Sequence, residues 1–173
     1  MKKIVSLLAL AFLFVACGSN DLDKETALKI LKEQGNNSKV IDFEIYTADP
    51  VQVRKVLDAK LEEEGLVKVQ RTQKLADLGK PLISFTEKAK PYLLPVSEED
   101  KKSKVQRVKV AEAVVANIVD VQSLEGEKRA VVKYETSFQK ITPFARLYDQ
   151  SFAVPDTGTA NFTLYDDGWK LEK

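Results

Sequence analysis

The sequence predicts an α+β fold, in which a helical N-terminal half is followed by an antiparallel β-sheet of three to four strands. Segments 23–34 and 50–64 repeat apolar residues every three or four positions, the spacing of an amphipathic helix. Segments 130–138 and 160–164 instead alternate apolar and polar residues, which is typical of half-buried strands. Segment 104–121 is dense in β-branched residues, which favour a long strand.

The chain begins with a segment of the kind that directs export. Two lysines at positions 2 and 3 precede an apolar run over 4–14, and the tetrapeptide FVAC ends at Cys17. The run is shorter than the roughly twenty residues that span a bilayer, so a cleaved signal fits better than a transmembrane helix. This N-terminus resembles the signal and lipobox of bacterial lipoproteins, in which a peptidase cuts before the cysteine.

The resemblance implies that residues 1–16 are a signal peptide and that 17–21 hold a lipidated Cys17 and a short tether. It places the protein in the cell envelope, attached to a membrane through its N-terminal lipid. Gly18 follows the cysteine, and is not the Asp that retains lipoproteins in the inner membrane of enteric bacteria. The outer membrane is therefore favoured if the source has one.

Composition limits the chemistry that the mature chain can perform. Removal of 16 of the 173 residues leaves 157, enough for one domain or two small ones. The predicted signal contains two of the 27 basic residues and none of the 26 acidic ones. The mature chain therefore has no excess of basic residues that would favour binding to nucleic acid. The chain has no histidine, the usual general base and the commonest ligand of transition metals. We therefore expect a protein that is not an enzyme and that holds no cofactor or metal.

The first region, residues 22–96, is predicted to mix helices and short strands. Gly35 stops the first helix, Asp49 and Pro50 begin the second, and Gly65 ends it. In chain order we expect a helix over 23–34, a strand over 40–46, a helix over 50–64, a strand over 66–69, a turn at 79–81, a strand over 82–85 and a short helix over 87–94.

Two motifs in this region, EGLV at 64–67 and LISFTEKA at 82–89, flank a variable polar segment. Together they resemble the helix end, wing and closing strand of winged-helix modules. The resemblance implies that 50–64 would be the recognition helix, although 36–49 looks extended where that family has its middle helix. The helix at 50–64 carries nearly balanced charges, which is unfavourable for phosphate contacts, so we expect no nucleic acid.

The second region, residues 97–173, is predicted to be antiparallel β-structure. Ser97 either caps one helical turn or begins a charged solvated link, and we favour the link. The expected order is a strand over 104–121, a turn at 125–127, a strand over 130–138, a loop over 142–156, a strand over 160–164 and a hairpin at 167–168. Residues 162–171 resemble the last hairpin of NTF2- or cystatin-like domains, which implies sheet topology.

The aromatic residues of the loop over 142–156 are the candidate binding residues. Phe144, Tyr148 and Phe152 either pack into a core, which we favour, or line a groove in which Arg146 is the only cation of the loop. On the second interpretation these four residues contact a partner, since aromatics and Arg supply much of the binding energy at interfaces.

The predicted function is a lipid-anchored, non-catalytic binding or assembly module of the bacterial cell envelope. The partner would be an envelope protein, a peptide or a glycan. Two alternatives stay open: a carboxylate-dependent envelope hydrolase, and a winged-helix nucleic-acid binder if the chain is not exported.

Lipidation is directly testable. We expect cells that make the chain to incorporate labelled palmitate into it, because two or more acyl chains at Cys17 make membrane attachment stable. The Cys17→Ala variant removes the acceptor thiol and is expected to carry no label. Equal labelling of the two proteins would end the lipoprotein hypothesis.

Overall fold

A computed structural model describes residues 21–34, 38–124 and 128–172 of the chain. The expected signal peptide, Cys17 and the expected turn at 125–127 lie outside these residues. Within the described ranges, none of the helices has the length and apolar character needed to cross a bilayer.

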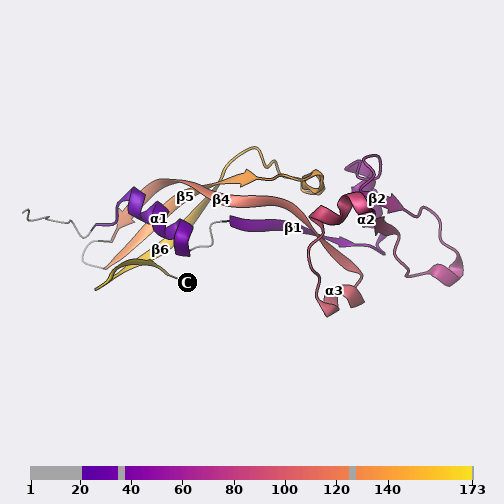
Figure 1. Cartoon of the computed structure of the whole chain (residues 1–173), viewed down its shortest axis with the longest axis horizontal. Helices are drawn as coiled ribbons and strands as arrows, with labels where there is room; N and C mark the ends of the chain where they lie inside the picture. The colour runs from indigo at the N-terminus through magenta and orange to yellow at the C-terminus, as the bar shows by residue number, and fades with distance from the viewer. Residues whose placement is uncertain (1–20, 35–37, 125–127, 173) are drawn as a thin grey trace, which may run out of the picture.

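The molecule is elongated and is built on one five-stranded antiparallel sheet of order β1-β4-β5-β6-β7, with a separate two-stranded sheet, β2-β3 (Figure 1). The helices are α1 (Lys24–Gln34), α2 (Pro50–Asp58) and α3 (Glu98–Lys102), with 3-10 helices η1 (Leu75–Asp77), η2 (Glu87–Tyr92) and η3 (Pro143–Leu147). The strands are β1 (Ser38–Tyr46), β2 (Val67–Val69), β3 (Ile83–Phe85), β4 (Val105–Ser123), β5 (Arg129–Gln139), β6 (Asp156–Tyr165) and β7 (Gly168–Leu171).

Strand β4 is paired with a neighbouring strand on each of its two edges. Its first part, Val105 to Val114, pairs with β1, and its second part, Glu112 to Ser123, pairs with β5 on the other edge. The two ladders overlap at three residues of β4, which are Glu112, Ala113 and Val114. β4 therefore joins two staggered ladders, which overlap at these three residues.

Two hydrophobic cores lie along β4, one on each ladder. The first core brings α2, β2, β3, η3 and the first half of β4 together around fully buried residues, among them Val56, Ile45, Ile83 and Phe144. The second core packs α1 against the second half of β4 and against β5 to β7. Ala27, Ile30 and Leu31 form the buried face of α1, as the helical spacing predicts.

The α+β class and the antiparallel sheet are confirmed. The sheet has five strands rather than the expected three to four, because β1 from the first region pairs with β4 of the second. The first core consequently contains residues from both sides of position 97. The hairpin at the chain's end is confirmed by the pairing of Tyr165 with Gly168, whose φ of 113° suits glycine.

Three local predictions need correction. The helix predicted over 50–64 ends at Asp58, because Lys60 takes a left-handed conformation (φ 57°) and the chain turns to bury Leu61. The favoured solvated link at 97–102 is wrong, since α3 forms there with a reciprocal cap between Ser97 and Asp100. The short helix expected over 87–94 is the 3-10 helix η2, which Pro91 limits.

The overlap of the two ladders carries a half-buried ion cluster. The Glu112 side chain is 13% exposed and forms ion pairs with Lys109 and, at 2.9 Å, with Lys140 from the turn after β5. Hydrogen bonds from Lys109 and then Lys140 hold the pKa of Glu112 below its usual value. The cluster thus links the doubly paired part of β4 to the end of β5.

This cluster predicts a pH dependence of folding. Since the folded-state pKa of Glu112 is lowered, its contribution to stability is present above about pH 4.5, the usual glutamate pKa, and is lost as pH falls through the folded value. We expect Glu112→Gln to be less stable than the wild type at pH 7, with the difference shrinking below pH 4.5. Urea unfolding across this pH range measures the difference, with Glu33→Gln on the exposed side of α1 as control. If Glu112→Gln is destabilised as much below pH 4.5 as at pH 7, the ion pairs of Glu112 are not the cause of the destabilisation.

Candidate functional site

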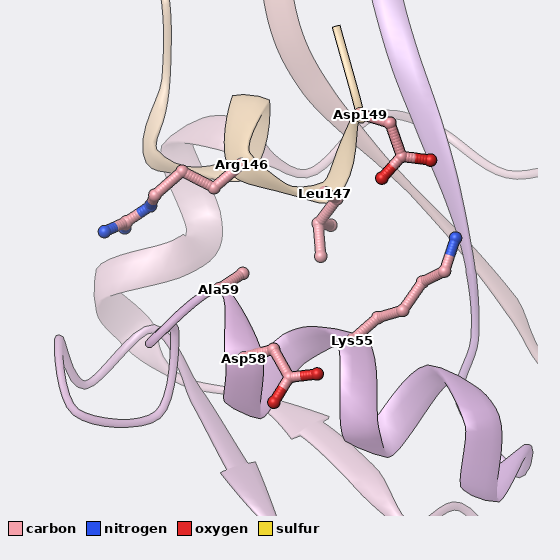
Figure 2. Close-up of a pocket in the computed structure, with 6 residues that line it drawn as sticks. All are labelled: Lys55, Asp58, Ala59, Arg146, Leu147 and Asp149. Carbon is pink, nitrogen blue, oxygen red and sulfur yellow. The ribbon is translucent and has the colours of Figure 1, made fainter.

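A cleft of about 500 Å³ lies between α2 and η3 (Figure 2). It is lined by Lys55, Asp58, Ala59, Arg146, Leu147 and Asp149. Its walls come from segments almost ninety positions apart in the sequence, and both segments pack on the first core. The cleft is therefore a product of the tertiary fold.

Helix α2 presents polar side chains to the cleft because its opposite face is buried. The Asp49 carboxylate accepts a hydrogen bond from the Val51 amide at 2.8 Å, and Pro50 starts the helix. Val56 is fully buried, which fixes the rotation of the helix. Lys55 then runs along the cleft, and its Nζ lies 5.6 Å from the centroid of the Phe43 ring, within the range of a cation–π contact.

Thr142 fixes the other wall to β4. Its amide donates to Val110 O at 2.8 Å, and its hydroxyl donates to Lys109 O at 2.7 Å. The same hydroxyl oxygen accepts a hydrogen bond from the Phe144 amide, which begins η3. Phe144 is completely buried and packs edge-on against Tyr92, so this aromatic ring anchors the loop in the core.

Arg146 stands at the rim of the cleft. Its guanidinium forms an ion pair with Glu64 at 2.7 Å and points away from the cleft in Figure 2. The side chain is 42% exposed, so an arriving anion can compete with Glu64 for it. A second hollow of about 480 Å³ lies on the other side of Arg146, and its lining includes Ile141, Tyr148 and Phe152.

Tyr148 and Phe152 belong to a chain of edge-to-face rings. Phe43, Tyr148, Phe152 and Phe138 follow one another with centroids 5.1 to 5.5 Å apart. The Tyr148 hydroxyl donates to Asp42 O at 2.7 Å. Burial, and then the charge of Asp42, raise the pKa of the Tyr148 hydroxyl, which therefore stays a protonated donor at neutral pH.

The four candidate residues from the sequence thus take different positions. Phe144 and Phe152 are buried in the first core, and Tyr148 is half-buried, so the aromatic rings are placed as the core interpretation expects. Arg146 is exposed and lines both hollows. The fifth site residue from the sequence, Cys17, lies outside the described residues.

Lys55, Asp58 and Asp149 are cleft residues that the sequence did not reveal. Lys55 and Asp58 are three positions apart on α2, so the shared face could be inferred from helical spacing. Asp149 belongs to a loop without regular structure, and no pattern in the sequence connects it to α2.

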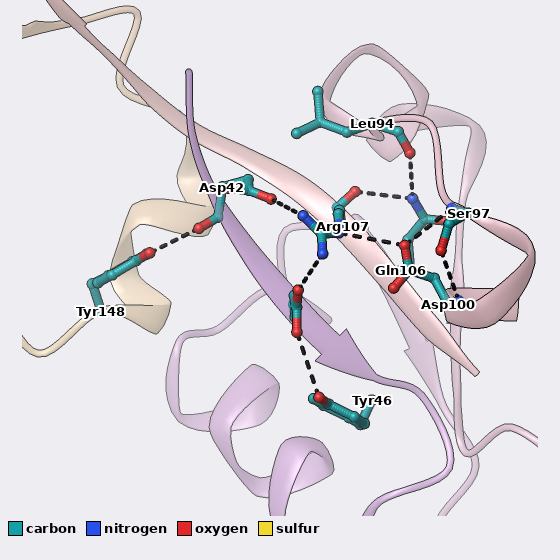
Figure 3. Close-up of polar contacts among 9 residues, drawn as sticks. Asp42, Tyr46, Leu94, Ser97, Asp100, Gln106, Arg107 and Tyr148 are labelled. Carbon is teal, nitrogen blue, oxygen red and sulfur yellow. Dashed lines mark hydrogen bonds and ion pairs between the residues drawn. The ribbon is translucent and has the colours of Figure 1, made fainter. Parts of the chain in front are cut away.

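A charge network next to the site connects Tyr148 to α3 through β1 (Figure 3). Arg107 forms ion pairs with Glu44 at 2.6 Å, Asp42 at 3.5 Å and Asp100 at 3.4 Å. Hydrogen bonds from the Ser97 amide and hydroxyl, and then the charge of Arg107, hold the pKa of Asp100 below its usual value. Arg107 on β4 therefore bridges two acids of β1 and one of α3, which ties α3 to the sheet.

The titration behaviour of the described residues is that of ion pairs and capped turns. Each of the described carboxyl groups with a shifted pKa is shifted down, by hydrogen bonds from nearby amides, a hydroxyl or basic side chains; these are Asp23, Glu62, Asp100, Glu112 and Asp167. Within the described ranges, no three His, Cys, Asp or Glu side chains gather as metal ligands would. The cleft can offer the Lys55 cation and the Asp58 and Asp149 carboxylates to a bound partner, with Arg146 at its rim.

Comparisons with protein-family models, with curated proteins and with solved structures found no match to the chain.

The burial of Phe144 predicts how variants of the loop behave. We expect Phe144→Ala to lower the free energy of unfolding by about 3–5 kcal/mol, because it removes a fully buried ring and leaves a cavity. Arg146→Ala is expected to change it by about 1 kcal/mol or less, since the ion pair that it removes is exposed. Denaturant unfolding followed by circular dichroism measures both values. Equal losses in the two variants would show that the loop is not divided into a buried anchor and an exposed rim.

Proposed function

We propose that the protein is a lipid-anchored, non-catalytic binding or assembly module of the bacterial cell envelope, which receives its partner at the cleft between α2 and η3. The observation that carries the proposal is the position of the lipobox-like sequence relative to the two cores. Cys17 comes shortly before α1, which belongs to the second core, whereas the cleft belongs to the first. Anchor and cleft would then lie on different parts of an elongated molecule.

Chain geometry limits the distance between the lipid and the fold. Asp21, the first described residue, is four positions after Cys17, and four extended residues span at most about 14 Å. A lipid on Cys17 would hold α1 near the membrane surface. The cleft, which belongs to the first core, would lie away from that attachment point along the molecule.

The lining of the site suggests the chemistry of the partner. Lys55 and Arg146 can meet carboxylates or carbonyl oxygens, and Asp58 and Asp149 can meet cations or amides. The adjoining hollow adds the half-exposed Ile141 and thus an apolar contact. An envelope protein or a peptide supplies all of these groups, while a glycan supplies mainly hydroxyls.

The winged-helix-like description of the first region is part of the proposal. The order α2, β2, β3 supports it, and β1 occupies the place of the middle helix. The curled sheet around α1 supports in the same way the likeness of residues 162–171 to NTF2- or cystatin-like hairpins. A scaffold of this type in the envelope would serve as a contact surface, because a fold does not fix a function.

Neither alternative function gains support from the site. A carboxylate-dependent hydrolase needs an acid whose pKa is raised, and the shifted carboxyl groups of the described residues are shifted down. A nucleic-acid binder needs a basic face, whereas the lining of the cleft contains two basic and two acidic residues. We therefore retain the binding module as the proposed function.

Site-directed crosslinking in cells tests the cleft. A photoreactive residue in place of Asp149 is expected to capture a partner, while one in place of Lys133, exposed on β5 in the other half, is not. The double variant Lys55→Ala/Arg146→Ala should reduce the captured product about tenfold, because charged side chains at an interface contribute specificity and affinity.

The matched control is Lys133→Ala/Arg129→Ala, which removes two exposed basic residues from β5. If the cleft variant keeps its circular dichroism spectrum and captures as much partner as the control, the cleft is not the binding site. Capture of carbohydrate instead of protein would identify a glycan ligand at the same site. The Cys17→Ala variant tests the lipid anchor and the Lys55→Ala/Arg146→Ala variant tests the cleft, so either part of the proposal can fail without the other.

A further inference from the structure

The connection between β2 and β3 contains two leucines, near its middle, that are not part of either core. Leu75 is 84% exposed and Leu78 is 68% exposed. They are three positions apart at the 3-10 helix η1, and side chains at this spacing in a 3-10 helix lie on the same side. One face of the turn therefore presents two large apolar side chains to solvent.

The connection is held in one shape by its own hydrogen bonds. At its base the Gln70 amide donates to Leu82 O at 2.8 Å, and the Gln73 side chain donates to Lys80 O at 3.0 Å. Lys80 forms an ion pair with Asp77 at 2.7 Å across the turn. These contacts tie the two arms of the connection to each other on either side of η1.

The same segment concentrates positive charge. Residues 68–82 hold four basic residues (Lys68, Arg71, Lys74 and Lys80) and one acid (Asp77), in a chain with 27 basic and 26 acidic residues. Arg71 is ion-paired with Glu62 at 2.5 Å and Lys80 with Asp77, so four basic residues minus these two acids leave a net charge of +2. All four basic residues are exposed. Lys104, which follows α3, adds a fifth cation by donating to Gly79 O. We call Leu75, Leu78 and these five cations the leucine tip.

We propose that the leucine tip binds an anionic phospholipid surface. The leucines enter the boundary between headgroups and acyl chains, and the lysines lie against the phosphates, which is the chemistry of interfacial membrane-binding segments. The tip protrudes, so it fits a deformable surface. Lysines are depleted in protein–protein interfaces, which makes a protein partner the less favoured occupant.

The tip lies at the end of the molecule opposite α1 (Figure 1). It is therefore a membrane contact separate from the proposed lipid at Cys17, and the proposal does not depend on lipidation. For this reason it can be tested on residues 18–173 without an acyl chain, since this part contains every helix and strand of the described structure.

Sedimentation with lipid vesicles tests the tip. The protein is expected to bind vesicles with about one third phosphatidylglycerol at least tenfold more tightly than vesicles of phosphatidylcholine, and to lose this preference at high salt. Leu75→Ser/Leu78→Ser should weaken binding about tenfold, because it removes the inserted apolar area. Lys74→Glu should weaken binding to the anionic vesicles alone. The matched control Leu124→Ser/Val154→Ser changes two exposed apolar residues elsewhere and should bind as the wild type does.

A fluorescent probe supplies a second readout. A tryptophan in place of Leu78 should shift its emission to the blue when anionic vesicles are added, whereas Trp169 in β7, the chain's single native tryptophan, should not respond. The proposal is overturned if the wild type does not bind anionic vesicles, or if the leucine variant binds them as well as the control does. Specific crosslinking of the tip to a protein without vesicle binding would overturn it as well.

Discussion

The backbone pairing of β4 on both of its edges determines how the rest of the chain is arranged. Its first part supplies a ladder for β1 and its second part a ladder for β5, so two separate cores are built on one continuous strand. In each core, other elements of the chain pack against one face of the ladder and bury it. Helix α1 covers one, and α2 with the β2-β3 sheet and η3 covers the other.

The same strand positions the cleft. Beyond the overlap with β5, the backbone of β4 offers hydrogen-bonding groups that β5 does not use, and Thr142 binds two of them through its amide and its hydroxyl. Phe144 then enters the core directly after this attachment, which leaves Arg146 at the rim. A loop of irregular backbone is thereby held in place by one threonine and one phenylalanine.

The sequence predicts the elements of this fold better than their partners. Helical spacing located α1 and alternation located β5 and β6, because these patterns record which face of each element is buried. The density of β-branched residues located β4. The pairing of β1 with β4 joins residues 59 to 76 positions apart, from Tyr46 with Val105 to Ser38 with Val114, and no local pattern specifies it. The end of α2 was misplaced for a related reason: Leu61 continues the helical pattern but is buried only because the chain turns at Lys60.

The candidate site was predictable only in part. The aromatic loop was recognisable by composition, but the division between buried Phe144 and exposed Arg146 depends on where Thr142 attaches to β4. The presence of Lys55 and Asp149 in the same cleft depends on the packing of two elements across the first core. Such juxtapositions follow from tertiary structure, whereas the lipobox-like motif is a property of the sequence alone.

The short overlap of the two ladders has a mechanical meaning. Three residues of β4 are paired with both β1 and β5, and on either side of them one of these two ladders continues without the other. Hydrogen bonds of an antiparallel ladder run perpendicular to the strands, so tension applied between the two ends of the molecule loads many of them in shear at once. At the overlap that tension passes through the covalent backbone of β4 itself. The molecule should consequently resist stretching along its length.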